Sequence, residues 1–365
     1  MQRNIIVIGA SAGGIEALTD LFALLPTDLA ASIFVVVHSS ADSPGMLPKI
    51  LANAGTLPAE YAKDGAPIAP GRVVVAPADH HLLLEQGRIR VTHGPKENRF
   101  RPAVDPLFRS AAYAYGHQVI GIILSGSLDD GTAGLWAIKD RGGLAVVQEP
   151  EESAYPSMPL HALRYVRIDY RLTIAEMGRL LPRLVGEPVA TEGRRSMLAN
   201  PGNPETPGKP DPIEIETKIA LENNALDAGV MKLGPLTPFT CPECNGVLVQ
   251  LQEGNLLRFR CHTGHAYTMD SLLASINDSI EKTLWSTVRA LEEQMLLLRH
   301  LARHVEEHAG EHAGEHDGES DAGSNGEHTE AELARRFAFK AQTAEDKVQI
   351  VRQLALRQSS EEASI

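Results

Sequence analysis

Residues 4–14 are NIIVIGASAGG, an apolar run that ends at a serine surrounded by glycines. Asn4–Ile8 is β-branched and apolar, which predicts a buried strand, and a helical pattern begins near Glu16. A serine at such a corner has its hydroxyl at the carboxyl edge of the sheet, and glycines allow substrate to approach closely. The N-terminus of the following helix favours developing negative charge. The stretch therefore predicts Ser11 as a candidate nucleophile.

Two other interpretations of these glycines stay open at this point. They fit a turn that cradles a nucleotide phosphate, or they simply pack the helix against the strand. The spacing is not the G-x-G-x-x-G pattern of dinucleotide-binding turns. A dinucleotide-binding fold typically has an acidic residue at the end of the next strand, whereas that strand is followed by His38 here.

The composition fits a globular protein of about two domains. The 365 residues are 43% hydrophobic but only 5% aromatic, so the core is mainly aliphatic. No apolar run approaches the roughly 20 residues of a membrane span, and no signal peptide is evident. Three late, clustered cysteines favour a reducing compartment, and we expect a cytoplasmic protein without membrane insertion. The net charge of −13 argues against a nucleic-acid partner.

Apolar strands alternate with helical patterns through residues 1–185. The further expected strands are residues 33–37, 72–76, 119–124 and 144–147, with a hairpin at 82–84 and 88–91. This alternation predicts an α/β fold with a doubly wound, mainly parallel sheet.

The composition changes after this first domain. Residues 186–212 are rich in proline and predict a flexible linker. A compact module is expected at 213–268, and a pair of helices at 269–365. We expect the linker to leave residues 213–365 without a fixed geometry, so that they recruit a partner or self-associate rather than take part in chemistry.

Two apolar stripes predict the helices of this last region. They consist of Ile276, Ile280, Leu284, Val288, Leu291, Met295 and Leu298, and of Leu333, Phe337, Ala341, Ala344, Val348 and Val351. The two helices fold back as an antiparallel pair or pair between chains. Between them, residues 306–330 are almost all Glu, His, Gly, Ser and Asp, which predicts a disordered tract.

A serine needs a base and an orienting acid to become a nucleophile near neutral pH. His38 directly follows the strand at 33–37, and Asp129 and Asp130 follow the strand at 119–124. Each also has a structural explanation. A lone histidine at such a position is more often structural, and an acidic pair beside glycine is usually a turn. Ligands nevertheless gather at the carboxyl edge of open α/β sheets. The convergence of these residues there predicts a hydrolytic site.

With these motifs the chain resembles the catalytic domain of the protein-glutamate methylesterases of bacterial chemotaxis, the CheB type. The resemblance covers roughly residues 3–185 and rests on GASAGG at 9–14, VVVH at 35–38, the stretch 89–107, LSGSLDDG at 124–131 and residues 148–159. It implies Ser11 as nucleophile, His38 as base and Asp130 as orienting acid. It also implies a serine hydrolase that demethylates glutamate γ-methyl esters on a methylated chemoreceptor-like partner and releases methanol. Deamidation of receptor glutamines is a second candidate activity.

The resemblance also implies an oxyanion site at the backbone of Ala12 and Ser127. The family usually has Met-Gly where this chain has Ser127-Leu128, so Leu128 can alter the turn. Loss of one oxyanion donor costs roughly a hundred- to a thousandfold in rate. Arg99 and Arg101 are candidate contacts for the acidic receptor helix, or anchors of their own loop.

Members of this family typically carry an N-terminal receiver domain, which blocks the site until a phosphorelay phosphorylates it. The first strand here begins within five residues of Met1, so we expect no receiver domain. The alternative function is a catalytically weakened signalling scaffold that binds partners through the module and the helices.

The expected module contains every cysteine of the chain, in CPEC at 241–244 and CHTGH at 261–265. C-x2-C with a second ligand pair on a hairpin, here 247–252 and 256–260, is typical of a structural zinc site. The expected ligands are Cys241, Cys244, Cys261 and His265, whereas His262 would point away. Four protein ligands leave no open position, so the predicted zinc-ribbon-like module is structural and no cofactor serves catalysis.

Overall fold

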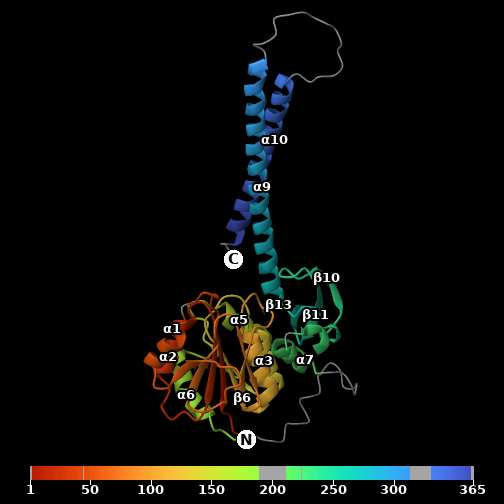
Figure 1. Ribbon diagram of the computed structural model, residues 1–365. Helices are drawn as coiled ribbons and strands as arrows, with labels where there is room; N and C mark the ends of the chain where they lie inside the picture. Colours follow the sequence, from red (N-terminus) through yellow and green to blue (C-terminus); the bar gives the residue numbers. More distant parts are fainter. Residues whose placement is uncertain (1, 44, 189–210, 223, 313–329, 363–365) are drawn as a thin grey trace, which may run out of the picture. The chain divides into compact units, whose positions relative to one another are not determined.

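The chain forms two compact units, Met1–Leu273 and Ala274–Ile365. The computed structural model describes residues 2–43, 45–188, 211–222, 224–312 and 330–362 (Figure 1). Most of the expected proline-rich linker and most of the expected Glu/His/Gly-rich tract lie outside these residues. None of the described helices has the length and apolar character to cross a membrane.

A seven-stranded sheet forms the centre of the first unit, in the order β3-β4-β2-β1-β7-β8-β9. All neighbouring strands pair in parallel, so the predicted doubly wound parallel sheet is confirmed. The strands are β1 (Ile5–Ala10), β2 (Ser32–Val37), β3 (Ala59–Tyr61), β4 (Arg72–Val75), β7 (Val119–Ile123), β8 (Leu144–Gln148) and β9 (Tyr170–Leu172).

Helices cover both faces of this sheet, which is why β1 is apolar at every position. Ile6 and Ile8 pack toward one face, with α1 (Gly14–Ala23), α2 (Leu47–Ala54) and α6 (Ile174–Leu184). Ile5 and Val7 pack toward the other, as the two-residue period of a strand requires. That face holds α3 (Val104–Tyr115), α4 (Thr132–Asp140), α5 (Ser157–Tyr165) and the predicted hairpin of β5 (His81–Glu85) and β6 (Arg88–Thr92).

A smaller antiparallel sheet follows in the same unit, within what we call the Cys/His module (residues 213–268). Its order is β10-β11-β12-β13, with β10 (Leu236–Thr240), β11 (Val247–Glu253), β12 (Leu256–Cys261) and β13 (Ala266–Thr268). The two helices α7 (Pro212–Glu222) and α8 (Ala225–Ala228) precede it. The hairpin expected at 247–252 and 256–260 is present as β11 and β12.

The module is not a loosely tethered appendage, which differs from the expectation that its geometry is not fixed. The physical reason is a buried group of charges. Arg258 and Arg260 on β12 donate to Glu216 on α7, and Arg260 Nη2 also donates to Glu97 Oε1 at 2.8 Å. Glu97 in turn pairs with Arg109 of α3. Removing one partner of a buried ion pair typically costs about 3–5 kcal/mol, so these charges hold the module on the sheet domain.

The second unit contains most of α9 (Met269–His312) and α10 (Glu330–Glu362), which lie side by side (Figure 1). Arg299 bonds Glu345 at 2.8 Å and Arg352 pairs with Glu292, which fits the expected antiparallel pair within one chain. The expected disorder of residues 306–330 is wrong at its start, because α9 continues to His312. Residues 306–309 hold no glycine or proline, so nothing there stops the helix.

Candidate active site

The structure brings Ser11, His38 and Asp130 together at the carboxyl edge of the sheet. Ser11 follows β1 and His38 follows β2, while Asp130 lies between β7 and α4. Because β1 lies between β2 and β7, these three strand ends are neighbours. His38 Nδ1 is 3.1 Å from Ser11 Oγ, and His38 Nε2 is 2.7 Å from Asp130 Oδ2. This is the hydrogen-bond chain that activates a serine nucleophile.

Asp130 is buried and held by several donors besides His38. Its Oδ2 accepts from the backbone N–H of Val104 at 2.6 Å, and its Oδ1 accepts from Asn98 Nδ2 at 2.8 Å and Gly131 N–H at 2.9 Å. Val104 is the first residue of α3, so the carboxylate lies at a helix N-terminus. Burial alone would raise the pKa of Asp130, but the bonds from His38, Val104 and Asn98 hold it below its usual range. The group is therefore an ionised, fixed acceptor.

The ring of Phe100 lies flat against His38, with centroids 3.6 Å apart and 11° between the planes. This contact and the bonds to Asp130 fix the imidazole so that Nδ1 faces the serine. Sequence reasoning did not single out Phe100 or Asn98 as site residues. Both lie in the stretch 89–107 on which the resemblance rests, and that was the available signal.

The glycines beside Ser11 serve a close approach of two loops. Gly13 has φ +69, and a Cβ there would lie 2.8 Å from Ala154 Cβ and from Ser125 Oγ. A Cβ on Gly126 would lie 2.9 Å from Ser11 Cβ. The Ser11 N–H donates to the carbonyl of Ser125 at 3.0 Å. The serine corner is therefore packed directly against the loop that contains Ser127.

The loop keeps its turn despite the Ser127-Leu128 departure. Leu128 has φ +61, the left-handed conformation that a glycine adopts without strain. Its carbonyl accepts from Ser157 Oγ at 3.0 Å, which holds the turn in place. Within the described part of the chain, the N–H groups of Ala12 and Ser127 donate to no protein acceptor. Both remain candidate donors to an oxyanion.

The two arginines differ in their surroundings. Arg101 donates to Asp79 Oδ1 through Nε at 2.8 Å and Nη2 at 2.7 Å, and to the Gly94 carbonyl at 2.9 Å. These bonds favour Arg101 as an anchor of its own loop. Arg99 is half-buried, has φ +78 and interacts with other residues.

Asp129 does not contact His38, although it neighbours the acid that does. Its Oδ1 accepts from Thr268 Oγ1 at 2.8 Å, and burial raises its pKa to about 6. Asp129, His161 and Asp270 have possible ligand atoms within 4.8 Å of one another. His161 Nε2 and Asp270 Oδ2 are 2.8 Å apart, which is an ordinary hydrogen-bond distance. Asp105 is a second carboxyl group near Asp130, and burial together with the charge of Asp130 raises its pKa to about 7.

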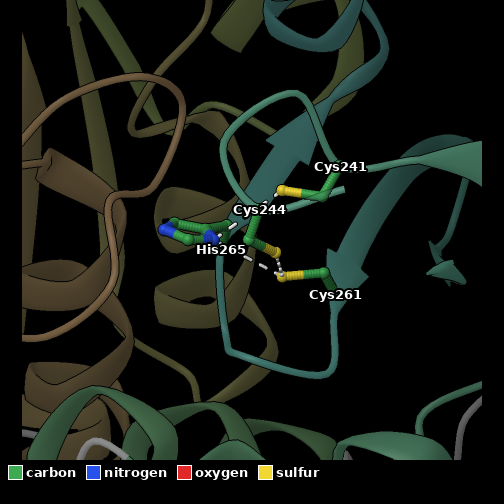
Figure 2. A group of neighbouring side chains, drawn as sticks. All are labelled: Cys241, Cys244, Cys261 and His265. Carbon is green, nitrogen blue, oxygen red and sulfur yellow. Dashed lines mark hydrogen bonds between the residues drawn. The ribbon is translucent and has the colours of Figure 1, made fainter. Parts of the chain in front are cut away.

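The four expected metal ligands converge in the Cys/His module (Figure 2). The Sγ atoms of Cys241, Cys244 and Cys261 and a ring nitrogen of His265 all lie within 4.8 Å of one another. Cys244 Sγ and Cys261 Sγ are 3.6 Å apart, and Cys261 Sγ and His265 Nδ1 are 3.5 Å apart. A tetrahedral zinc with Zn–S bonds of about 2.3 Å separates its sulfur ligands by about 3.7 Å. His262 is exposed and packs near Gly246 instead.

The fold and the site together define a doubly wound α/β protein with a Ser-His-Asp chain at the carboxyl edge of its sheet. The family model for CheB methylesterase matches residues 6–181. A putative protein-glutamate methylesterase/protein-glutamine glutaminase of Leptospira interrogans is 38% identical over 185 residues, which are 50% of this chain and 96% of that relative. The chain belongs to the CheB methylesterase family, and it is an enzyme.

Two further comparisons cover the same half of the chain. Protein-glutamate methylesterase/protein-glutamine glutaminase 2 of Anaeromyxobacter dehalogenans is 39% identical over 181 residues, which are 50% of this chain and 53% of that relative. The crystal structure of the Thermotoga maritima CheB methylesterase catalytic domain has 32% identity and a TM-score of 0.47. The matched region covers 51% of this chain and 100% of the Thermotoga chain.

Proposed function

We propose that this enzyme hydrolyses glutamate γ-methyl esters on a methylated chemoreceptor-like protein. The main observation that supports this is the contact of His38 with both Ser11, at 3.1 Å, and Asp130, at 2.7 Å, in a CheB methylesterase domain. The names of the Leptospira and Anaeromyxobacter relatives support both this substrate and protein glutamine as a second one. An intact hydrogen-bond chain favours catalysis over the alternative of a weakened scaffold.

The proposed reaction is an acyl transfer through Ser11. His38 Nδ1 takes the proton of Ser11 Oγ as that oxygen attacks the ester carbonyl carbon, and the N–H groups of Ala12 and Ser127 stabilise the oxyanion. His38 returns the proton to the leaving methoxide, so methanol departs and a glutamyl ester of Ser11 remains. Water then attacks this ester with His38 again as base, which restores Ser11 and leaves glutamate. A glutamine side chain would release ammonia by the same steps.

We also propose that the Cys/His module binds one structural zinc ion through Cys241, Cys244, Cys261 and His265. The grouping of their four donor atoms within 4.8 Å of one another supports this, and a site with four protein ligands has no position for a substrate. The three cysteines form no disulfide, which fits the reducing cytoplasm where we propose the enzyme acts.

Self-association of the helical pair is a further part of the proposal, with a second copy of this chain as the partner. Leu296, Leu297 and Phe339 are 60%, 59% and 75% exposed. A two-helix hairpin with such side chains in water can cover them by pairing into a four-helix bundle. Sedimentation of the full chain measures this. A strictly monomeric protein at micromolar concentration would contradict the proposal.

The decisive experiment for the enzyme is methanol release from membranes that contain a methylated chemoreceptor. Ser11→Ala and His38→Ala should each abolish most of the activity while the fold remains. Because the members of such a site act as a unit, the double variant should be scarcely slower than either single variant. Full activity of Ser11→Ala, or clearly additive losses, would refute the assignment.

A further inference from the structure

The segment that supports the active site is itself held by the Cys/His module. Ala266 of β13 accepts a hydrogen bond from the Asn98 N–H at 2.8 Å and donates to the Lys96 carbonyl at 3.3 Å. Glu97 forms a β-bridge with Ala266, so residues 96–98 extend along the edge of the module's sheet. Asn98 has φ +49, a left-handed conformation that asparagine adopts more readily than most residues with a Cβ.

The side chain of Asn98 joins the module to the acid of the triad. Its Nδ2 donates to Asp130 Oδ1 at 2.8 Å and to Asp105 Oδ2 at 2.9 Å. Its Oδ1 accepts from the N–H of Thr268 and from Ser271 Oγ, both at 3.1 Å. An amide side chain has two N–H donors and an oxygen with two lone pairs. All four hydrogen-bonding positions of this buried amide are therefore used.

These partners allow only one orientation of the amide. The backbone N–H of Thr268 can only donate, and it is shared between Ser271 Oγ at 2.9 Å and Asn98 Oδ1 at 3.1 Å, so it favours the oxygen of Asn98 on the module side. On the other side the ionised carboxylate of Asp130 can only accept, so it requires the N–H groups there. A rotated amide would face a donor with a donor and an acceptor with an acceptor, and each mismatched buried group is costly. The module thus sets which atom faces Asp130.

We propose that Asn98, oriented by Thr268 of the Cys/His module and by Ser271 at the start of α9, is a positioning residue for the triad, so that the module is a working part of the active site. Asn98 fixes the carboxylate of Asp130, which in turn orients His38. Phe100, two residues later, stacks on the same imidazole. The segment 97–100 therefore links the module to both the imidazole of His38 and the carboxylate of Asp130. This inference rests on the proposed esterase function and extends it.

The metal ligands are close to this connection in the chain. His265 directly precedes Ala266, and the Cys261 N–H donates to the His265 carbonyl at 3.0 Å. Arg260 Nη1 donates to the Gly264 carbonyl at 2.8 Å while its Nη2 bonds Glu97, the neighbour of Asn98. A correctly folded loop at 261–265 is therefore needed to place both β13 and Arg260.

The test compares Asn98→Asp with Asn98→Ala in the full-length enzyme. The aspartate variant keeps the shape of the side chain but places an oxygen, in place of the N–H groups, against Asp130 and Asp105. A hydrogen bond to a charged group is worth a factor of about 10 to 150 in equilibrium, so Asn98→Ala should lower kcat about 10- to 100-fold with KM unchanged. Asn98→Asp should be slower than Asn98→Ala, and increasingly so as the pH rises and the new carboxyl loses its proton.

A role limited to filling space predicts the opposite order, because aspartate fits the site better than alanine. A kcat for Asn98→Asp equal to or above that of Asn98→Ala at all pH values would therefore overturn the proposal. Because either variant can fail to fold, Ser271→Ala provides a milder change. It removes one hydroxyl donor to Asn98 and should lower kcat about 3- to 10-fold.

The matched control is Ser110→Ala, which removes another fully buried hydroxyl. Ser110 Oγ accepts from the Leu84 N–H at 3.0 Å and makes no contact with the triad. It should lower the melting temperature but leave kcat unchanged, and equal kcat losses for Ser110→Ala and Ser271→Ala would overturn the proposal. Ser11→Ala in the same assay separates the two hypotheses. If wild type and Ser11→Ala release methanol equally, the proposed function fails; if only Ser11→Ala is inactive and the Asn98 variants keep wild-type kcat, the positioning role alone fails.

Discussion

Asp130→Asn replaces one oxygen of the buried carboxylate by an amide nitrogen, and the surrounding donors decide where that nitrogen goes. At the Oδ1 position it would face three N–H groups, those of Asn98, Gly131 and Asp105. At the Oδ2 position it would face two, those of Val104 and His38. The second arrangement is favoured because His38 can change its tautomer, whereas a backbone N–H cannot.

In that arrangement His38 accepts a hydrogen bond through Nε2 and carries its proton on Nδ1, the nitrogen that faces Ser11. The base is then already protonated toward the serine. In a serine protease this wrong tautomer lowers kcat about 10⁴-fold, which corresponds to about 5.5 kcal/mol of activation free energy. The remaining clash with the Val104 N–H leaves a buried donor unpaired and should lower the free energy of unfolding by about 1–3 kcal/mol.

Initial rates of methanol release at saturating substrate and thermal unfolding monitored by circular dichroism measure these two quantities separately. Asp129→Asn is the control, because it makes the same change one residue earlier and the new amide oxygen can still accept from Thr268. Its kcat should stay within about threefold of wild type, as expected for a group outside the hydrogen-bond chain. A kcat for Asp130→Asn within tenfold of wild type, or an equal loss in Asp129→Asn, would refute the reasoning.

Three further predictions concern metal, backbone strain and pH. Elemental analysis should find one zinc per chain, lost in Cys244→Ser but kept in His262→Ala; the reverse would show that the ligand set is wrong. In denaturant titration, the free energy of unfolding of Leu128→Gly should be about 1–2 kcal/mol higher than that of Leu128→Ala, because only glycine adopts positive φ without strain. Equal free energies of unfolding would exclude strain at this position. Since burial raises the pKa of Asp129 from 3.8 to about 6, its ionisation opposes folding. Wild type should therefore lose stability relative to Asp129→Asn as the pH rises from about 4 to 6, and parallel stability profiles would contradict this.

The sheet, Ser11 and His38 could be predicted from the sequence because their signals are local, whereas the choice of Asp130 over Asp129 came from the family resemblance. A parallel strand buried on both faces is a continuous apolar run, and such runs directly precede Ser11 and His38. The strands β3 and β9 were not predicted, since each is three residues long and only partly buried. Edge strands of this kind carry too few apolar positions to show a period.

The support around the site could not be predicted, because it depends on contacts between distant segments. Asn98 and Ser271 are 173 positions apart, and Glu97 and Arg260 are 163 apart. Charged residues are usually solvated, so nothing in the sequence marks Glu216 or Arg260 as buried. The expectation of a freely tethered module came from composition alone, which carries no information about such partners.

The hydrogen bonds that end at Ser271 have a consequence for the way this enzyme can be divided or recombined. The match to the family ends at residue 181, and a cut there would appear to isolate a complete catalytic domain. It would also remove Thr268, Ser271 and Arg260, and so take away the partners that Asn98 and Glu97 have outside the sheet domain. A chimera that joins this sheet domain to another tail should therefore exchange everything up to residue 273 as one block. The smallest interchangeable part of the chain is larger than the segment that it shares with its relatives.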